Sequence, residues 1–202
     1  MCEETTIASA RKIELREAAY RYSLAHGLAD LSLRPLAAAI GSSPRVLMFL
    51  FGNKDGLLRE LLARARMEEL AMLGHIQEAS NTTAIGLAAA IERVWVWLAA
   101  DEHRQLLKMW AEAYARSLIE PDGVWGGFAA TTVSDWLAVL AACQPPSERD
   151  SEEGAARRTL ALAILRGALL DLLATADHDR VTAAVHHQLA LFHHRRAAVP
   201  RP

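Results

Sequence analysis

The sequence predicts an all-α protein, and three features of it lead to this class. Alanine and leucine are abundant, while β-branched residues are sparse. No stretch alternates polar and apolar residues with the period of two that a strand requires. Glycine and proline fall between the stretches of helical periodicity, and they mark breaks at Gly27, Gly41, Gly52, 121–123 and 144–154. Loose order is expected only in the first few residues, in the polar linker 144–154 and in the C-terminal tail.

Length and composition describe a globular chain. Its 202 residues are enough to bury a core, and 52% of them are hydrophobic against 23% charged. Cys2 and Cys143 are far apart and match no metal-ligand spacing, which favours a reducing compartment. The first residues are acidic where a signal peptide is basic, and Glu92 and Arg93 interrupt the most apolar stretch. We therefore expect a cytoplasmic protein without a membrane span.

The first part of the chain contains apolar stripes at helical spacing. A first helix ends at Gly27, and a second, capped by Ser32, is barely two turns long. A third short helix takes Ser43 as its cap, and a fourth, capped by Asn53, runs to about residue 79. The stripes of the first two helices are made by Leu15, Ala18, Ala19 and Tyr22, and by Leu33, Leu36, Ala37 and Ile40.

Two such short helices bury too little surface by themselves, so they must pack on the first and fourth helices. A helix pair joined by a glycine turn is the shape that places its second helix in the major groove of DNA. We therefore expect an N-terminal three-helix helix-turn-helix DNA-binding domain over residues 1–54. A second, C-terminal helical domain is expected over residues 55–202.

Seven short elements follow one another between Leu15 and Leu58. They stand at Ala18–Ala19, Gly27, Ser32, Leu36–Ala37, Gly41–Ser43, Leu47–Phe51 and Gly52–Leu58. In these residues the chain resembles the N-terminal domain of TetR-type transcriptional repressors, and beyond them only size and helicity agree. The resemblance implies a dimeric protein that binds operator DNA through its N-terminal domain, and whose C-terminal domain, residues 55–202, binds a small molecule and forms the dimer. The chain departs from the family in two places. It has Arg45 and Val46 where Gly-Thr is common after Pro44, and Met48, Phe49 and Leu50 where the family often has an aromatic hydroxyl that contacts a phosphate.

The side chains of the third helix fall on two opposite faces. One face is made by Leu47, Leu50 and Phe51, and the opposite face by Arg45, Met48 and Phe49. We expect the first face to be buried, which leaves Arg45 to read guanine while Met48 and Phe49 meet thymine methyl groups and sugar edges. The alternative for the two apolar side chains is packing on another helix or on a neighbouring subunit.

Lys54 lies in the first turn of the fourth helix, where free N–H groups favour an anion. A lysine at this place contacts a DNA phosphate in the family that the chain resembles, and we predict the same here, with a solvated surface lysine as the alternative. Arg34, Ser42 and Ser43 are further phosphate candidates, although a serine can also serve only as a cap. The net charge of −2 argues against indiscriminate DNA binding, so affinity should depend on dimer geometry and direct readout.

The rest of the chain predicts five longer helices, at about 83–100, 103–119, 124–143, 155–176 and 179–195. All five tryptophans lie in this part. A mostly apolar cavity with a few polar groups is typical of small-molecule sites, so we predict an effector pocket, with an ordinary aromatic core as the alternative. The predicted pocket residues are Trp95, His103, Trp110, Tyr114 and Trp136.

The last two helices are apolar enough to need partners on two sides. Together with the resemblance, this predicts a homodimer through a four-helix seam, and a core helix within one chain is the alternative. The seam stripe of the final helix is Val181, Val185, Leu189 and Phe192. Histidines also cluster late, but no carboxylate or cysteine joins them at ligand spacing, so we expect a polar face rather than a metal site.

The predicted function is that of a ligand-responsive transcriptional regulator. In this hypothesis it is a repressor that a small, mostly apolar effector releases from double-stranded operator DNA. The rival class is a helical-bundle enzyme, or a small-molecule-binding protein without DNA binding. The sequence has no Glu-x-x-His pair, no glycine-rich phosphate loop and no plausible Ser/His/Asp set, so we expect neither catalysis nor a cofactor.

Overall fold

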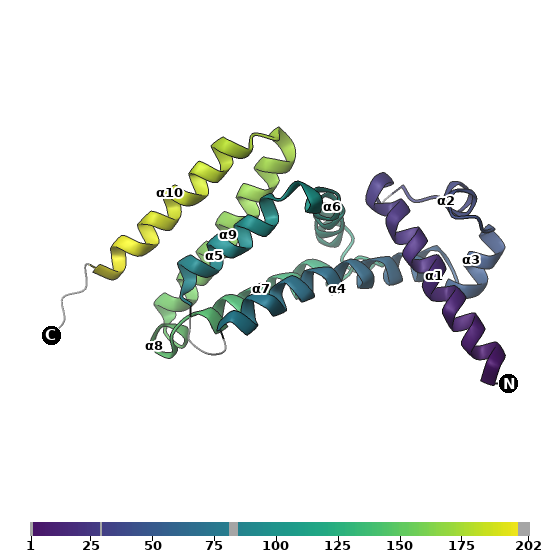
Figure 1. The fold of residues 1–202 in the computed structure, drawn as a ribbon, viewed down its shortest axis with the longest axis horizontal. Coiled ribbons are helices and arrows are strands. Elements are labelled where there is room, and N and C mark those ends of the chain that lie inside the picture. The colour runs from purple at the N-terminus through teal and green to yellow at the C-terminus, as the bar shows by residue number, and fades with distance from the viewer. Residues whose placement is uncertain (1, 29, 81–84, 198–202) are drawn as a thin grey trace. The chain divides into compact units, whose positions relative to one another are not determined.

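The computed structural model describes residues 2–28, 30–80 and 85–197, and the regular elements in these ranges are all helical (Figure 1). The all-α class is thereby confirmed. The helices are α1 (Cys2–His26), α2 (Leu33–Ala39), α3 (Pro44–Phe51), α4 (Lys54–Ser80), α5 (Leu87–Ala99), the 3-10 turn η1 (Asp101–His103), α6 (Arg104–Ile119), α7 (Phe128–Cys143), α8 (Pro146–Arg149), α9 (Glu152–Thr175) and α10 (His178–Ala197). None of the described helices combines the length and apolarity needed to cross a membrane.

The helices form two compact units that are each discontinuous in sequence. The first unit combines residues 1–69 with 105–129, and the second combines 70–104 with 130–202. Helix α6 therefore packs in the same unit as the predicted helix-turn-helix. The predicted domain boundary after residue 54 stays a prediction.

In the first unit, an apolar core holds α1 to α4 together. Its least accessible side chains include Leu15, Ala19, Leu36, Leu47, Leu57 and Leu61. Ion pairs join α1 to α4 around this core: Lys12 Nζ lies 2.6 Å from Glu60 Oε1, and Arg64 Nε donates to Glu17 Oε2 at 2.9 Å. Since these charges are partly exposed, each pair contributes about 0.2–1 kcal/mol, and the buried apolar side chains contribute most of the stability.

Two of the three predicted helix caps are confirmed. Ser43 Oγ accepts a hydrogen bond from the Val46 amide at 3.3 Å, and Asn53 Oδ1 accepts one from the Gly56 amide at 2.7 Å. The prediction that the Ser32 hydroxyl caps α2 is wrong, because that side chain makes no capping bond. The third residue of α2 is Pro35, which lacks the N–H group that a capping hydroxyl often reaches.

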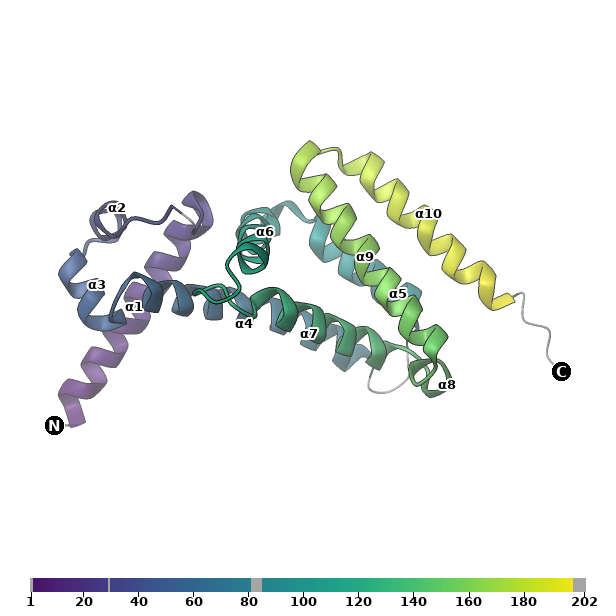
Figure 2. The same ribbon diagram turned by 180° about the vertical axis from the view of Figure 1, so that it is seen from behind.

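In the second unit, α5, α9 and α10 pack on one another and lie side by side (Figure 2). Trp95 is buried among them and donates its indole N–H to Thr182 Oγ1 at 3.1 Å. Val181, Val185 and Leu189 are also buried within this unit. Assigning this stripe of α10 to the dimer seam is therefore wrong for these three residues, and the side chain of Phe192 lies outside the description.

The segment 144–154, which its polar composition predicts to be a loosely ordered linker, is in fact ordered. It contains α8, and the Gln144 side chain is buried. The Arg149 guanidinium donates to the carbonyls of Ala141, Ala142 and Gln144 at 3.0, 3.3 and 3.2 Å and so closes the end of α7. The polar side chains are thus used inside the fold, which composition alone does not reveal.

Three predicted helix ends also differ from the structure. Residues 124–127 form turns before α7, although Trp125 is buried there. Helix α1 already begins at Cys2, where the sequence suggests loose order. The helix predicted from residue 83 begins at Leu87, and residues 83–84 lie outside the description.

Candidate functional site

The turn between α2 and α3 sets the direction of α3. The two helices pack on each other across residues 40–43. Gly41 has a φ of +64°, a backbone conformation that glycine adopts without strain, and the Ser42 amide donates to the Ala37 carbonyl at 2.8 Å. Backbone contacts therefore fix the helix pair in the predicted helix-turn-helix form.

Helix α3 buries one face and exposes the other. Leu47 and Phe51 are buried, and Leu50 is intermediate. On the opposite face the Arg45 side chain is exposed, Met48 is 50% exposed and Phe49 is 84% exposed. The predicted division of faces is confirmed. Burying a side chain as large as phenylalanine is worth about 1.5–3 kcal/mol, so the exposed face offers binding energy to a partner.

Three cations of the helix pair and of the residues that follow it are exposed: Arg34 on α2, Arg45 on α3 and Lys54 at the start of α4. Within the described residues none of the three forms an ion pair. The cations between α1 and α4 differ, because Lys12 and Arg64 both contact carboxylates. Burial opposes ionisation of Glu17, but its hydrogen bonds to Arg64 and Arg16 outweigh this and lower its pKa. The positive charges of Lys12 and Arg64 are therefore neutralised by carboxylates. Those of Arg34, Arg45 and Lys54 have no carboxylate partner among the described residues.

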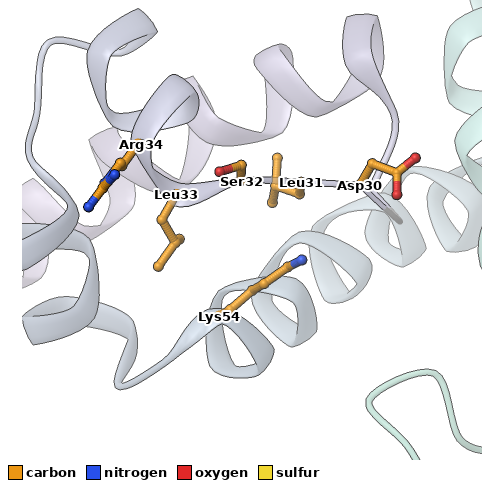
Figure 3. Close-up of a pocket in the computed structure, with 6 residues that line it drawn as sticks. All are labelled: Asp30, Leu31, Ser32, Leu33, Arg34 and Lys54. Atoms are coloured by element: carbon orange, nitrogen blue, oxygen red, sulfur yellow. The ribbon is translucent and has the colours of Figure 1, made fainter.

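A hollow of about 600 Å³ lies beside Arg34 and Lys54. Asp30, Leu31, Ser32, Leu33, Arg34 and Lys54 line it (Figure 3). Lys54 extends from the start of α4 toward the chain between Asp30 and Ser32, as Figure 3 shows. A helix N-terminus beside an unpaired lysine attracts an anion such as a phosphate group.

The two serines of the turn are placed differently from each other. The Ser42 hydroxyl oxygen is buried and has no hydrogen-bond partner among the described residues. Ser43 is exposed, but its hydroxyl is engaged with the Val46 amide. Their contacts with phosphate stay predictions, and of the two only Ser43 faces solvent here.

Two residues of the predicted effector pocket, Trp110 and Tyr114, lie one turn apart on α6 in the first unit. Their ring centroids are 5.0 Å apart with a tilt of 33°. The indole nitrogen of Trp110 is buried and has no hydrogen-bond partner among the described residues. A buried donor without an acceptor is costly, by about 1–3 kcal/mol, which a bound acceptor would relieve.

The other three, Trp95, His103 and Trp136, lie in the second unit. Trp95 is part of the α5–α9–α10 core, and Trp136 is also buried. His103 stacks on Trp97 at 4.2 Å between centroids, and its Nδ1 lies 2.9 Å from the Trp97 carbonyl oxygen. Their roles as effector contacts stay predictions.

Sequence reasoning missed Glu112 of α6. Its Oε2 accepts a hydrogen bond from the Leu28 amide at 2.8 Å, across 84 residues of sequence. No motif marks a glutamate on a helix surface as the partner of a distant turn. The glycine at position 27 was recognisable as a helix end, but its neighbour on α6 was not.

The comparisons with known proteins concern the fold. No protein-family profile matches the sequence, and no curated protein matches it. A proposed TetR-family transcriptional regulator from Rhodococcus sp. superposes with a TM-score of 0.70 at 15% identity, over 90% of this chain and 98% of that one. The multidrug binding protein EbrR complexed with proflavin superposes with a TM-score of 0.62 at 23% identity, over 88% of this chain and 98% of that one. A proposed transcriptional regulator from Pseudomonas aeruginosa PAO1 superposes with a TM-score of 0.60 at 20% identity, over 93% of this chain and 94% of that one. The chain therefore has the fold of these regulators over most of its length.

Proposed function

We propose that this chain is a DNA-binding transcriptional regulator of the TetR type that acts as a homodimer. The observation that carries the proposal is the exposed face of α3, with Arg45, Met48 and Phe49 among unpaired cations. An apolar and cationic face on the second helix of a helix-turn-helix matches the major groove, which presents methyl groups and acceptors beside phosphates.

The cations have different roles in this proposal. Lys54 and Arg34 contact phosphates, which orient the protein on the duplex without reading sequence. Arg45 lies near the start of α3 and contacts a guanine edge, which specifies a base pair. Few phosphates are neutralised by each protomer, so two protomers on an inverted repeat supply the remaining affinity.

The dimer forms through the outer face of α9 and α10. On α9, exposed residues recur at spacings of three and four as Leu160, Ala163, Gly167, Leu170 and Ala174. On α10 the exposed series is Ala184, His187 and Leu191. Leucines that are about half exposed, alternating with small residues, allow two helices to approach closely. A second copy of the chain covers this face as a four-helix seam.

A small, mostly apolar effector regulates DNA binding through a shift in the population of dimer conformations. We place its contacts on α6 at Trp110 and Tyr114, because the buried Trp110 N–H has no acceptor among the described residues. EbrR, which shares the fold, binds proflavin. Proflavin is therefore a first probe, and a rise in melting temperature reports its binding. Trp110→Phe keeps an apolar aromatic ring, although a smaller one, and removes the N–H, so it should reduce that rise.

The proposed function is tested by selecting duplexes from a random pool with the purified protein. The expected result is enrichment of an inverted repeat that the protein shifts in a gel and that also occurs upstream of its own gene. A pool that stays random after repeated rounds, while the protein is folded and dimeric, would contradict DNA binding. In that case a binding protein without a DNA target becomes the better hypothesis.

A further inference from the structure

A side-chain to backbone hydrogen bond within the first unit joins α6 to the turn after α1. Glu112 Oε2 lies 2.8 Å from the Leu28 amide nitrogen. The same oxygen lies 3.2 Å from the point where a side chain at Gly27 would place its Cβ. Gly27 has a φ of +80°. A glycine there both ends α1 and allows the carboxylate to approach the backbone.

The Leu28 amide depends on this acceptor. The Gly27 amide closes α1 by donating to the Ser23 carbonyl at 2.8 Å, but the next amide, that of Leu28, turns away from the helix toward Glu112. The side chains of Leu28 and Leu31 are buried, so the turn cannot swing outward to give the amide to water without exposing them. Glu112 therefore supplies the hydrogen-bond acceptor that the local backbone does not offer to the Leu28 amide.

The position of the charge makes this contact breakable. A carboxylate is disfavoured at the C-terminal end of a helix such as α1, because the helix dipole is negative there. The hydrogen bond to a charged acceptor outweighs that repulsion while the two atoms stay in range. A displacement of α6 by roughly 1 Å takes the nitrogen and oxygen beyond hydrogen-bond distance.

The turn leads into α2. Helix α2 begins at Leu33, and Arg34, a predicted phosphate contact, follows directly. α2 in turn packs on α3. A displacement of the backbone at Leu28 would therefore move α2, and with it the α3 face that the proposed function assigns to DNA.

We propose that Glu112 is a positioning residue for DNA binding: its carboxylate holds the α1–α2 turn in the form that presents α2 and α3, and a movement of α6 that breaks this bond lowers operator affinity. This rests on the proposed function. Because α6 also carries Trp110 and Tyr114, the contact makes α6 a route by which an effector changes DNA binding.

Three variants separate the hydrogen bond from the charge and from general packing. Glu112→Ala removes the acceptor, Glu112→Asp keeps the charge but is one methylene too short, and Glu112→Gln keeps a neutral acceptor of the same reach. Glu120→Ala is the matched control, because Glu120 follows α6 and pairs with Arg116 at the surface. Far-ultraviolet circular dichroism verifies that each variant is folded.

Two readouts are measured on the full-length dimer. Hydrogen–deuterium exchange of the Leu28 amide should become at least about tenfold faster in the Ala and Asp variants and stay near wild type in the Gln variant. Binding to the selected duplex should weaken roughly tenfold in the Ala and Asp variants, with rescue by Gln. The control should change neither readout. A merely structural role would speed exchange at Leu28 and lower the melting temperature without changing operator affinity.

Each outcome decides the proposal. Unchanged exchange at Leu28 in Glu112→Ala would overturn it, as would wild-type operator affinity in a variant whose Leu28 amide exchanges fast. If Glu112→Ala does not fold, the Asp and Gln pair gives the same comparison. If the wild type binds no selected duplex, the proposed function fails, and unchanged Leu28 exchange then shows separately that Glu112 does not hold the turn.

Discussion

Helices α3 and α9 both leave large apolar side chains in solvent, but their surroundings differ. On α3, Met48 and Phe49 stand beside Arg45, and Arg34 and Lys54 flank the helix pair. On α9, Leu160 and Leu170 alternate with alanine and glycine at helical spacing. Exposed apolar area with unpaired cations suits a polyanion that also has apolar groups, as DNA does. Exposed leucines among small residues suit another helix. The neighbours of an apolar side chain, more than its exposure, indicate the partner.

The largest expected effect concerns α9. Leu170→Glu places a charge in the proposed seam, which costs at least about 3 kcal/mol when it is left unpaired in an apolar interface. We expect monomers in analytical ultracentrifugation. Val96→Glu, which alters another exposed apolar side chain of the same unit on α5, should remain dimeric. Dimers of unchanged affinity for Leu170→Glu would remove α9 from the seam.

The next effect concerns base reading by α3. Arg45→Ala should weaken operator binding by about 1–3 kcal/mol and relax the preference at one base pair in each half-site. Binding measured on a set of single-base operator variants checks this. An equal loss on every duplex, non-operator DNA included, would instead make Arg45 a phosphate contact.

Lys54 should behave in the opposite way. Lys54→Ala should weaken binding about equally on operator and non-operator DNA, because a phosphate carries no sequence information. It should also lower the magnitude of the log–log salt slope by about one for each protomer. A titration over several salt concentrations measures both quantities. An unchanged slope would mean that Lys54 is a solvated surface lysine.

The smallest effect concerns the apolar part of the α3 face. Replacing thymine by uracil in a half-site removes only a methyl group, whose burial contributes about 0.8 kcal/mol of binding free energy. Operator affinity should fall by that amount at the positions that Met48 and Phe49 contact. In the Phe49→Ala variant, the same replacement at the position of Phe49 should no longer matter. Equal sensitivity in wild type and variant would contradict the contact.

The sequence allowed the helix order and the faces of α3 to be predicted, because glycine breaks and apolar spacing are local signals. The sequence did not allow contacts between residues far apart in the chain to be predicted. The apolar stripe of α10 was predicted correctly, and it consists of Val181, Val185 and Leu189. Periodicity does not tell whether such a stripe packs on α5 of the same chain or on a second copy. Glu112 likewise carries no local sign that its acceptor serves the Leu28 amide.

The central claim, that the exposed face of α3 lies on DNA, is tested most directly by photocrosslinking. Phe49, which is 84% exposed, is replaced by the photoreactive p-benzoylphenylalanine, and Val96 is replaced in the same way as the control. We expect the variant at position 49 to crosslink to the selected duplex at bases of each half-site, and the variant at position 96 to give none. Binding of the duplex without any crosslink from position 49 would contradict the claim.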